Sequence, residues 1–137
     1  MKVFRFMSKK EYEKLIKGEK LVNRARHIAH TTSIGFCFMD LKDNPPEVAF
    51  HYLIGLVCPE VCVIFNVKNK NVLSKGYGRY TDINSENFFA RCIREEYYTT
   101  QYSREDLEPI MVSKKIDLNL NDFGYIFNWN EVENVKD

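Results

Sequence analysis

Short segments rich in aromatic and β-branched residues recur along the whole chain and leave little room for long helices. The clearest is the run Val61–Val67, which predicts a buried strand. Further strands are predicted at residues 3–6, 34–39, 97–102, 110–112, 116–120 and 125–129, with another starting at residue 72. Ten Phe, eight Tyr and one Trp among 137 residues fit this strand-rich pattern.

Short helices are predicted between these strands. Ser8 and Glu11 form a capping box, and Gly18 supplies the stop signal of the helix that follows. Three more helices are expected, at residues 47–53, after Ser85 with Phe88, Phe89, Cys92 and Ile93 facing inward, and from Ser103 to near Pro109. Because strands and helices mix without a regular βαβ rhythm, we expect a single α+β domain over residues 1–137.

Net charge and hydropathy exclude several classes of protein. The 20 Lys and Arg residues nearly balance the 19 Asp and Glu residues, and the net charge of +1 disfavours a protein that binds nucleic acid by neutralising phosphates. The start of the chain has no apolar segment typical of a secretory signal, and no run is long enough to span a membrane. We therefore expect a cytoplasmic protein without a membrane partner.

Cysteine, histidine and glycine motifs indicate little chemistry when each is taken alone. The four cysteines, Cys37, Cys58, Cys62 and Cys92, lack a zinc spacing and are expected to be reduced core residues. His27 and His30 have no third ligand nearby in the sequence, so no metal is expected. Gly76 and Gly78 lack the third glycine of a dinucleotide fingerprint and indicate a loop or turn instead.

The order of three segments carries more information. A strand that contains Arg5 leads into the capped helix, and the aromatic strand from Gly35 to Asp40 leads into a helix that contains Tyr52. Last comes Glu96, which opens the aromatic segment Glu-Tyr-Tyr-Thr. This order resembles the ADP-ribosyltransferase superfamily, whose members include diphtheria-type toxins and poly(ADP-ribose) polymerases. The resemblance spans nearly the whole chain, through pattern and order rather than long identities.

The resemblance implies an α+β fold of mostly antiparallel sheets, split around an NAD cleft, with short helices. It also implies catalytic residues Glu96, Arg5 and Tyr52, and NAD-binding residues Arg5, Phe36, Tyr52, Tyr97 and His30. Arg5 stands where the polymerase-like branch has a histidine, which leaves the branch open. Glu95 replaces Glu96 if the register shifts by one residue.

The residue types suit the chemistry that this resemblance implies. A carboxylate such as Glu96 can stabilise the oxocarbenium-like state formed when the nicotinamide–ribose bond breaks. Tyr52 can stack on nicotinamide, and Arg5 can form charge-assisted bonds to ribose or diphosphate. The expected activity is mono-ADP-ribosyl transfer from NAD, as substrate, to a macromolecular acceptor, with a protein favoured over nucleic acid by the low net charge.

Three alternatives remain at this point. A catalytically inactive domain that binds an ADP-ribose-like ligand would keep Tyr52 without needing Glu96. An RNA 2′-phosphotransferase shares the implied fold and would use Arg5 and His30. A small interaction or inhibitor protein would use exposed tyrosines as anchors, namely Tyr77, Tyr80 and Tyr102.

Overall fold

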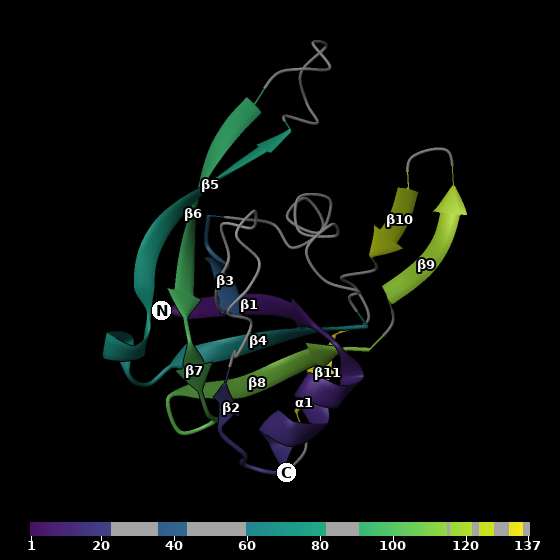
Figure 1. Cartoon of the computed structure of the whole chain (residues 1–137). Helices are drawn as coiled ribbons and strands as arrows, with labels where there is room; N and C mark the ends of the chain where they lie inside the picture. Colours follow the sequence, from purple (N-terminus) through teal and green to yellow (C-terminus); the bar gives the residue numbers. More distant parts are fainter. Residues whose placement is uncertain are drawn as a thin grey trace.

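The protein is described here by a computed structural model that covers residues 1–22, 36–43, 60–81, 91–114, 116–121, 124–127 and 132–135. In these ranges the main element is a seven-stranded sheet with the order β11-β8-β4-β1-β3-β6-β5 (Figure 1). Its strands are β1 (Lys2–Met7), β3 (Phe36–Asp40), β4 (Val61–Val67), β5 (Ser74–Thr81), β6 (Arg91–Thr99), β8 (Leu107–Ser113) and β11 (Glu133–Asn134).

Smaller elements complete the described part. Two two-stranded ribbons pair β2 (Leu21–Val22) with β7 (Gln101–Tyr102), and β9 (Ile116–Asn121) with β10 (Gly124–Phe127). Helical structure is limited, within the described ranges, to α1 (Lys9–Ile16) and the 3₁₀ turn η1 (Lys70–Val72). Every strand pairing in these ranges is antiparallel. The predicted mostly antiparallel sheet is confirmed, in a β-rich architecture whose described part has one short α-helix rather than the several predicted.

The seven-stranded sheet consists of two halves that meet at β1 and β3. β1 pairs with β4 along its full length, from Lys2 opposite Asn66 to Met7 opposite Val61. Its pairing with β3 is limited to Val3 opposite Asp40 and Phe4 opposite Met39. Figure 1 shows the consequence: β1, β4 and β8 run across the view, whereas β3, β5 and β6 run steeply upward. The sheet therefore turns sharply where β1 and β3 separate.

Side chains alternate between two buried faces of the sheet. We call one the helix face, because its apolar cluster contains Leu15 of α1. Besides Leu15, that cluster includes Val3, Met7, Leu21, Phe38, Val61, Val63, Phe65, Tyr102, Leu107 and Val112. The cluster on the opposite face contains Phe4, Phe6, Cys37, Met39, Cys62 and Ile64. We call this second side the Glu96 face. Burial on both sides explains why β4 is a continuous apolar run from Val61 to Phe65, and why Arg5 is the one charged residue between Val3 and Met7 of β1.

Helix α1 begins and ends at the residues that the sequence predicts. The Ser8 side chain accepts a hydrogen bond from the Glu11 backbone N–H at 3.1 Å and so caps the first turn. Gly18 has a φ of +82°, a left-handed conformation that favours glycine after a helix end. The cap and the stop fix the direction of α1, which places Leu15 in the core and turns Glu11 toward the sheet.

Two predicted helices are wrong where the structure describes them. Residues 91–93, expected at the end of the helix after Ser85, belong to β6, and Ile93 is 63% exposed. Residue 85 itself lies outside the described residues, as does the predicted helix 47–53. Ser103 starts a turn rather than a helix, because its carbonyl accepts from the Asp106 N–H at 3.1 Å and β8 begins one residue later. In both places strand pairing overrides the local helix signal.

The predictions of a loop at Gly76 and Gly78 and of an exposed Tyr102 are also wrong. Gly76 and Gly78 lie within β5, paired with Glu96 and Arg94, and do not form a loop. Tyr102, expected as an exposed anchor, is fully buried, where its ring packs edge-to-face on Phe38 and Phe65 at centroid distances of 5.3 and 6.0 Å. Cys37 and Cys62 do occupy core positions, as predicted. Among the described residues, no helix is long and apolar enough to cross a membrane.

Candidate functional site

Arg5 lies on the helix face and is held by α1. Its Nε and Nη2 donate to the two carboxylate oxygens of Glu11, at 2.7 and 2.8 Å. The Tyr102 hydroxyl donates to the same carboxylate at 2.7 Å. With Arg5 only 8% exposed, this is a buried two-point ion pair with a third donor. Such a network fixes α1 against β1.

Arg5 also stands at the place where the two halves of the sheet separate. Its Nη1 donates to the Cys37 carbonyl at 3.3 Å, beyond the last backbone pair between β1 and β3. The guanidinium lies over the Phe36 ring, with Cζ 4.9 Å from the ring centroid. Burial disfavours the charge, but the bonds and charge of Glu11 outweigh it, so the pKa of Arg5 is raised. Arg5 thus remains charged and links both halves.

Glu96 lies in the middle of β6 and its side chain points to the opposite face. Its strand neighbour Tyr97 is paired with Phe38 of the helix face, so alternation turns Glu96 toward the Cys37 thiol. The side chain is 2% exposed, and its Oε1 has no hydrogen-bond partner among the described residues. A buried carboxyl with an unused oxygen is costly unless a ligand or a proton satisfies it.

The protonation states of Glu96 and Cys37 follow from the burial of both side chains. Burial raises the pKa of Glu96 to about 7, while a hydrogen bond with the Cys37 thiol opposes the shift. Burial, followed by the charge of Glu96, raises the pKa of Cys37 well above its usual range. The thiol therefore stays protonated and can donate to the carboxylate. At neutral pH Glu96 is poised between its neutral and charged forms, as a group that exchanges a proton or stabilises charge requires.

The structure places the site residues predicted from the sequence on different faces. Arg5, Phe36 and Tyr97 share the helix face, where the two rings pack against its apolar cluster. Glu96 lies on the other face, so Arg5 and Glu96 do not share a face of the sheet. Tyr52 and His30 lie outside the described residues.

Glu95, the alternative to Glu96, has a side chain that is 45% exposed and pairs with Lys75 at 2.9 Å. Its environment is that of a solvated surface carboxylate. Of the two neighbouring glutamates, burial and an unpaired oxygen single out Glu96.

Sequence reasoning missed two residues that contact the predicted ones. The sequence indicates only a capping role for Glu11, yet its side chain neutralises Arg5. The sequence indicates a core role for Cys37, yet its carbonyl also accepts from Arg5 and its thiol contacts Glu96. Strand alternation could have indicated where Cys37 points. It lies between Phe36 and Phe38, which are both on the helix face, so its side chain faces the side of Glu96. No sequence signal links Glu11 to Arg5, because their contact depends on how α1 packs.

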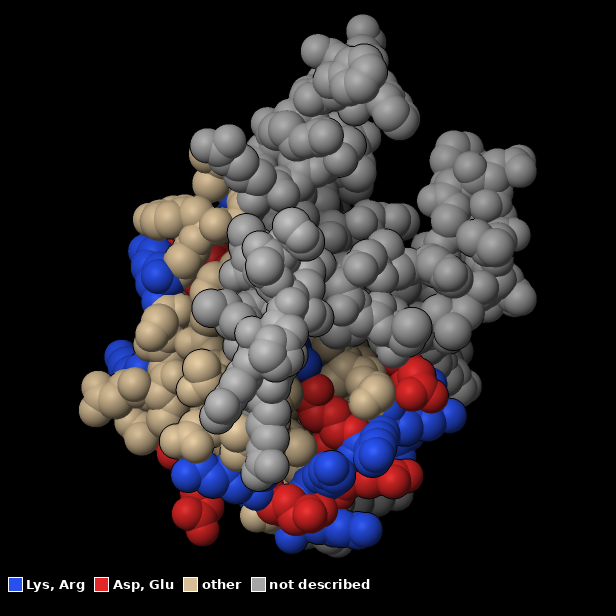
Figure 2. All heavy atoms as spheres, in the orientation of Figure 1, with Lys and Arg blue, Asp and Glu red and all other residues tan. Residues whose placement is uncertain are grey.

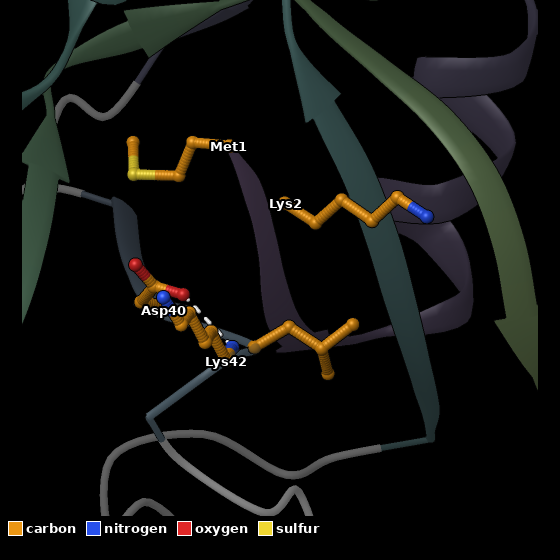
Figure 3. A pocket seen from close by; sticks show the side chains of 5 residues that line it. Met1, Lys2, Asp40 and Lys42 are labelled. Atoms are coloured by element: carbon orange, nitrogen blue, oxygen red, sulfur yellow. Dashed lines mark hydrogen bonds between the residues drawn. The ribbon is translucent and has the colours of Figure 1, made fainter.

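A pocket of about 510 Å³ lies apart from these residues, at the start of β1 and the end of β3. It is lined by Met1, Lys2, Asp40, Leu41 and Lys42. Figure 3 shows the Met1 and Lys2 side chains pointing in opposite directions, and the Asp40 carboxylate accepting from the Lys42 backbone N–H at 2.8 Å. None of the predicted site residues lines this pocket, so it adds nothing to their chemistry.

Metal-ligating groups and the distribution of surface charge can be judged for the described residues. In the described ranges, no group of three or more His, Cys, Asp or Glu side chains is arranged to hold a metal ion. Figure 2 shows acidic and basic side chains intermixed over the described lower part of this face. Over these described residues, such mixing creates no single-sign field that would steer a charged macromolecule.

Comparison of the chain with protein-family profiles, with curated proteins and with solved structures finds no match. The site must therefore be interpreted from its own geometry.

Proposed function

We propose that the chain is a mono-ADP-ribosyltransferase, which transfers ADP-ribose from NAD to a macromolecular acceptor and releases nicotinamide. The observation that carries this proposal is the state of Glu96. It is a nearly fully buried carboxyl whose Oε1 lacks a partner among the described residues, and its pKa is raised to about 7. Such a group reduces stability, so a role in binding or chemistry would explain why the sheet contains it.

Glu96 has the properties that breaking the nicotinamide–ribose bond needs. Departure of nicotinamide leaves positive charge on the ribose, and a fixed carboxylate beside the ring stabilises that charge. The unpaired Oε1 can accept a hydrogen bond from a ribose hydroxyl, which would also compensate its burial. Because Glu96 is paired with Gly76 of β5 and the next residue, Tyr97, is paired with Phe38 of β3, the backbone that carries the carboxylate is fixed for this task.

The proposed NAD cleft would lie near the place where β1 and β3 separate. The two strands pair at only two positions, so the halves of the sheet diverge where Arg5 and Cys37 meet. Arg5 is already bound to Glu11 on the helix face, so we assign it a positioning role. It keeps the diverging halves in a fixed relation, while Glu96 acts on the opposite face. Tyr52 and His30 stay candidates for NAD contacts.

Incubation with NAD and a cell lysate tests the proposal, with nicotinamide release and mass-tagged products as readouts. We expect Glu96→Gln to abolish both, because the amide cannot supply negative charge to the transition state. Glu95→Gln is the matched control, since it removes a neighbouring exposed carboxylate and should leave release unchanged. Equal nicotinamide release from the wild type and Glu96→Gln would contradict the catalytic role of Glu96.

One observation favours a second function, that of an interaction protein. Tyr77 and Ile93 are 66% and 63% exposed and lie on the adjacent strands β5 and β6. Tyr77 is paired with Glu95, two residues from Ile93, so both side chains are diagonal neighbours on one side. An exposed aromatic beside an aliphatic residue suits a protein contact. Absence of an NAD-induced thermal shift in the wild type would favour this function over the transferase.

A further inference from the structure

The two edges of the seven-stranded sheet differ in length. β5 is the last strand at one edge and spans eight residues, which pair with β6 on its inner side (Figure 1). β11, at the other edge, has two residues, and both are exposed. In an antiparallel ladder, alternate residues direct the backbone N–H and C=O to opposite sides of the strand. Half of the residues of β5 therefore direct these groups away from β6, where no described strand binds them.

The edge formed by β5 lacks several features that commonly protect such an edge. Short strands, proline and β-bulges are usual protections. β5 contains no proline, and its register with β6 is unbroken from Ser74 to Thr81. The Lys75 ammonium pairs with Glu95 of β6 at 2.9 Å, so this charge lies over the sheet rather than beyond its edge. The side chain of Arg79, the other charged residue of β5, lies outside the described residues. An edge with these properties can pair with a strand of another chain.

Exposed apolar side chains lie beside this edge, on the helix face. Tyr97 packs against the cluster of that face, and alternation along β6 places Glu95 and Ile93 on the same side. Tyr77 of β5 is paired with Glu95 and shares that side. Tyr77 and Ile93 are both more than half exposed, so apolar surface continues past the core to the edge. We call Tyr77 and Ile93 the edge patch.

Charge and symmetry favour a second copy of the chain as the partner of this edge. The ion pair beside the edge patch, between Lys75 and Glu95, compensates its own charge, so these side chains offer no net charge to an acidic or basic peptide. The whole chain has a net charge of +1, which opposes self-association only weakly. Antiparallel pairing about a two-fold axis covers both β5 edges at once and places both edge patches on one side of the joined sheet.

We propose that the chain forms a two-fold symmetric dimer in which β5 pairs antiparallel with β5 of a second copy. The two seven-stranded sheets then become one continuous sheet, with backbone hydrogen bonds across the two-fold axis and the edge patches side by side next to them. This dimer goes beyond the transferase proposal and does not depend on it.

Sedimentation velocity of the full chain, from micromolar to submillimolar concentration, tests the dimer. We expect the wild type to change from monomer to dimer as the concentration rises. Tyr77→Lys places like charges in the two adjoining patches and should weaken dimerisation about tenfold or more. Val22→Lys is the matched control, because Val22 is an exposed apolar residue of the β2–β7 ribbon, outside the seven-stranded sheet. It should dimerise like the wild type. A wild type that is monomeric throughout, or a Tyr77→Lys variant that dimerises as well as the wild type, would overturn the proposal.

Hydrogen exchange of the wild type locates the interface without any substitution, and so serves if Tyr77→Lys does not fold. Alternate backbone amides of β5 should exchange quickly at low concentration and become protected at high concentration. A dimer whose β5 amides exchange as fast as those of the monomer has its interface elsewhere and would overturn the proposal. A monomer in which all β5 amides are already protected has this edge covered by its own chain, which would overturn it as well.

Discussion

Arg5 and Glu11 are six residues apart in the chain and meet through two hydrogen bonds of 2.7 and 2.8 Å inside the core. The pair joins the first strand to the first helix, and the Tyr102 hydroxyl completes it from the other end of the sequence. The charge of Arg5 is thereby satisfied within the protein itself.

We expect Arg5→Met to lower the free energy of unfolding by about 3 kcal/mol, because the Glu11 carboxylate is left without its buried partner. The double variant Arg5→Met with Glu11→Leu should regain much of this loss, since it buries no unpaired charge. Urea denaturation measures both values. Lys68→Met provides the control: its ion pair with Glu108 is exposed, and removing it should change stability little. A double variant no more stable than Arg5→Met would contradict this account.

The stability of the protein should fall as the pH rises toward neutrality. The folded state holds a proton on Glu96 up to about pH 7, whereas the unfolded chain releases it near 4.5. The stabilising effect of the bound proton is therefore complete below pH 4.5 and is lost as the pH rises through 7, an effect on the order of 3 kcal/mol.

Denaturation of the wild type and Glu96→Gln at pH 5 and pH 8 isolates this effect from that of other titrating groups. The glutamine variant lacks the titration, so it should gain stability relative to the wild type between the two pH values. A constant difference between the two proteins would show that Glu96 does not titrate in this range.

Gly76→Ala should destabilise the protein by about 1–3 kcal/mol, because the new methyl group must displace the Tyr98 ring. In Tyr98→Ala the same glycine substitution should cost less, since the ring is gone. A double-mutant cycle from urea midpoints gives the coupling between the two positions. Additive effects would mean that the ring does not cover Gly76.

Ser8→Ala should cost about 1 kcal/mol, because the Glu11 backbone N–H loses its capping acceptor. Ser8→Asp should retain most of the stability, since aspartate caps equally well. Thermal denaturation followed by circular dichroism compares the variants. A neutral alanine substitution would indicate that the bonds of Glu11 to Arg5 and Tyr102 hold the first turn without the cap.

Local signals predicted the parts of the fold that depend on local physics. The capping box at Ser8, the stop at Gly18 and the buried run Val61–Val67 all appear as predicted. The helix predicted after Ser103 was wrong because serine and acidic residues suit both a helix start and a turn. Only the pairing of β8 with β4 decides between the two. The loop prediction at Gly76 was wrong for a similar reason. A glycine is needed there because the ring of Tyr98, which is distant in the sequence, packs on it.

The candidate site shows the same limit. Sequence order singled out Arg5 and Glu96, and both are buried. Which face each side chain takes depends on register between strands that are far apart in sequence. A single residue along β6 separates Tyr97 on one face from Tyr98 on the other, and composition carries no information about that choice.

The position of β1 in the sheet has a consequence for folding during synthesis. This strand is made before both of its partners, because the short partner β3 and the long partner β4 follow later in the chain. Until β4 leaves the ribosome, the apolar side chains of β1 have no sheet to join. Folding must therefore wait for contacts between distant segments, and we expect the chain to fold slowly and to expose aggregation-prone strands in the interval.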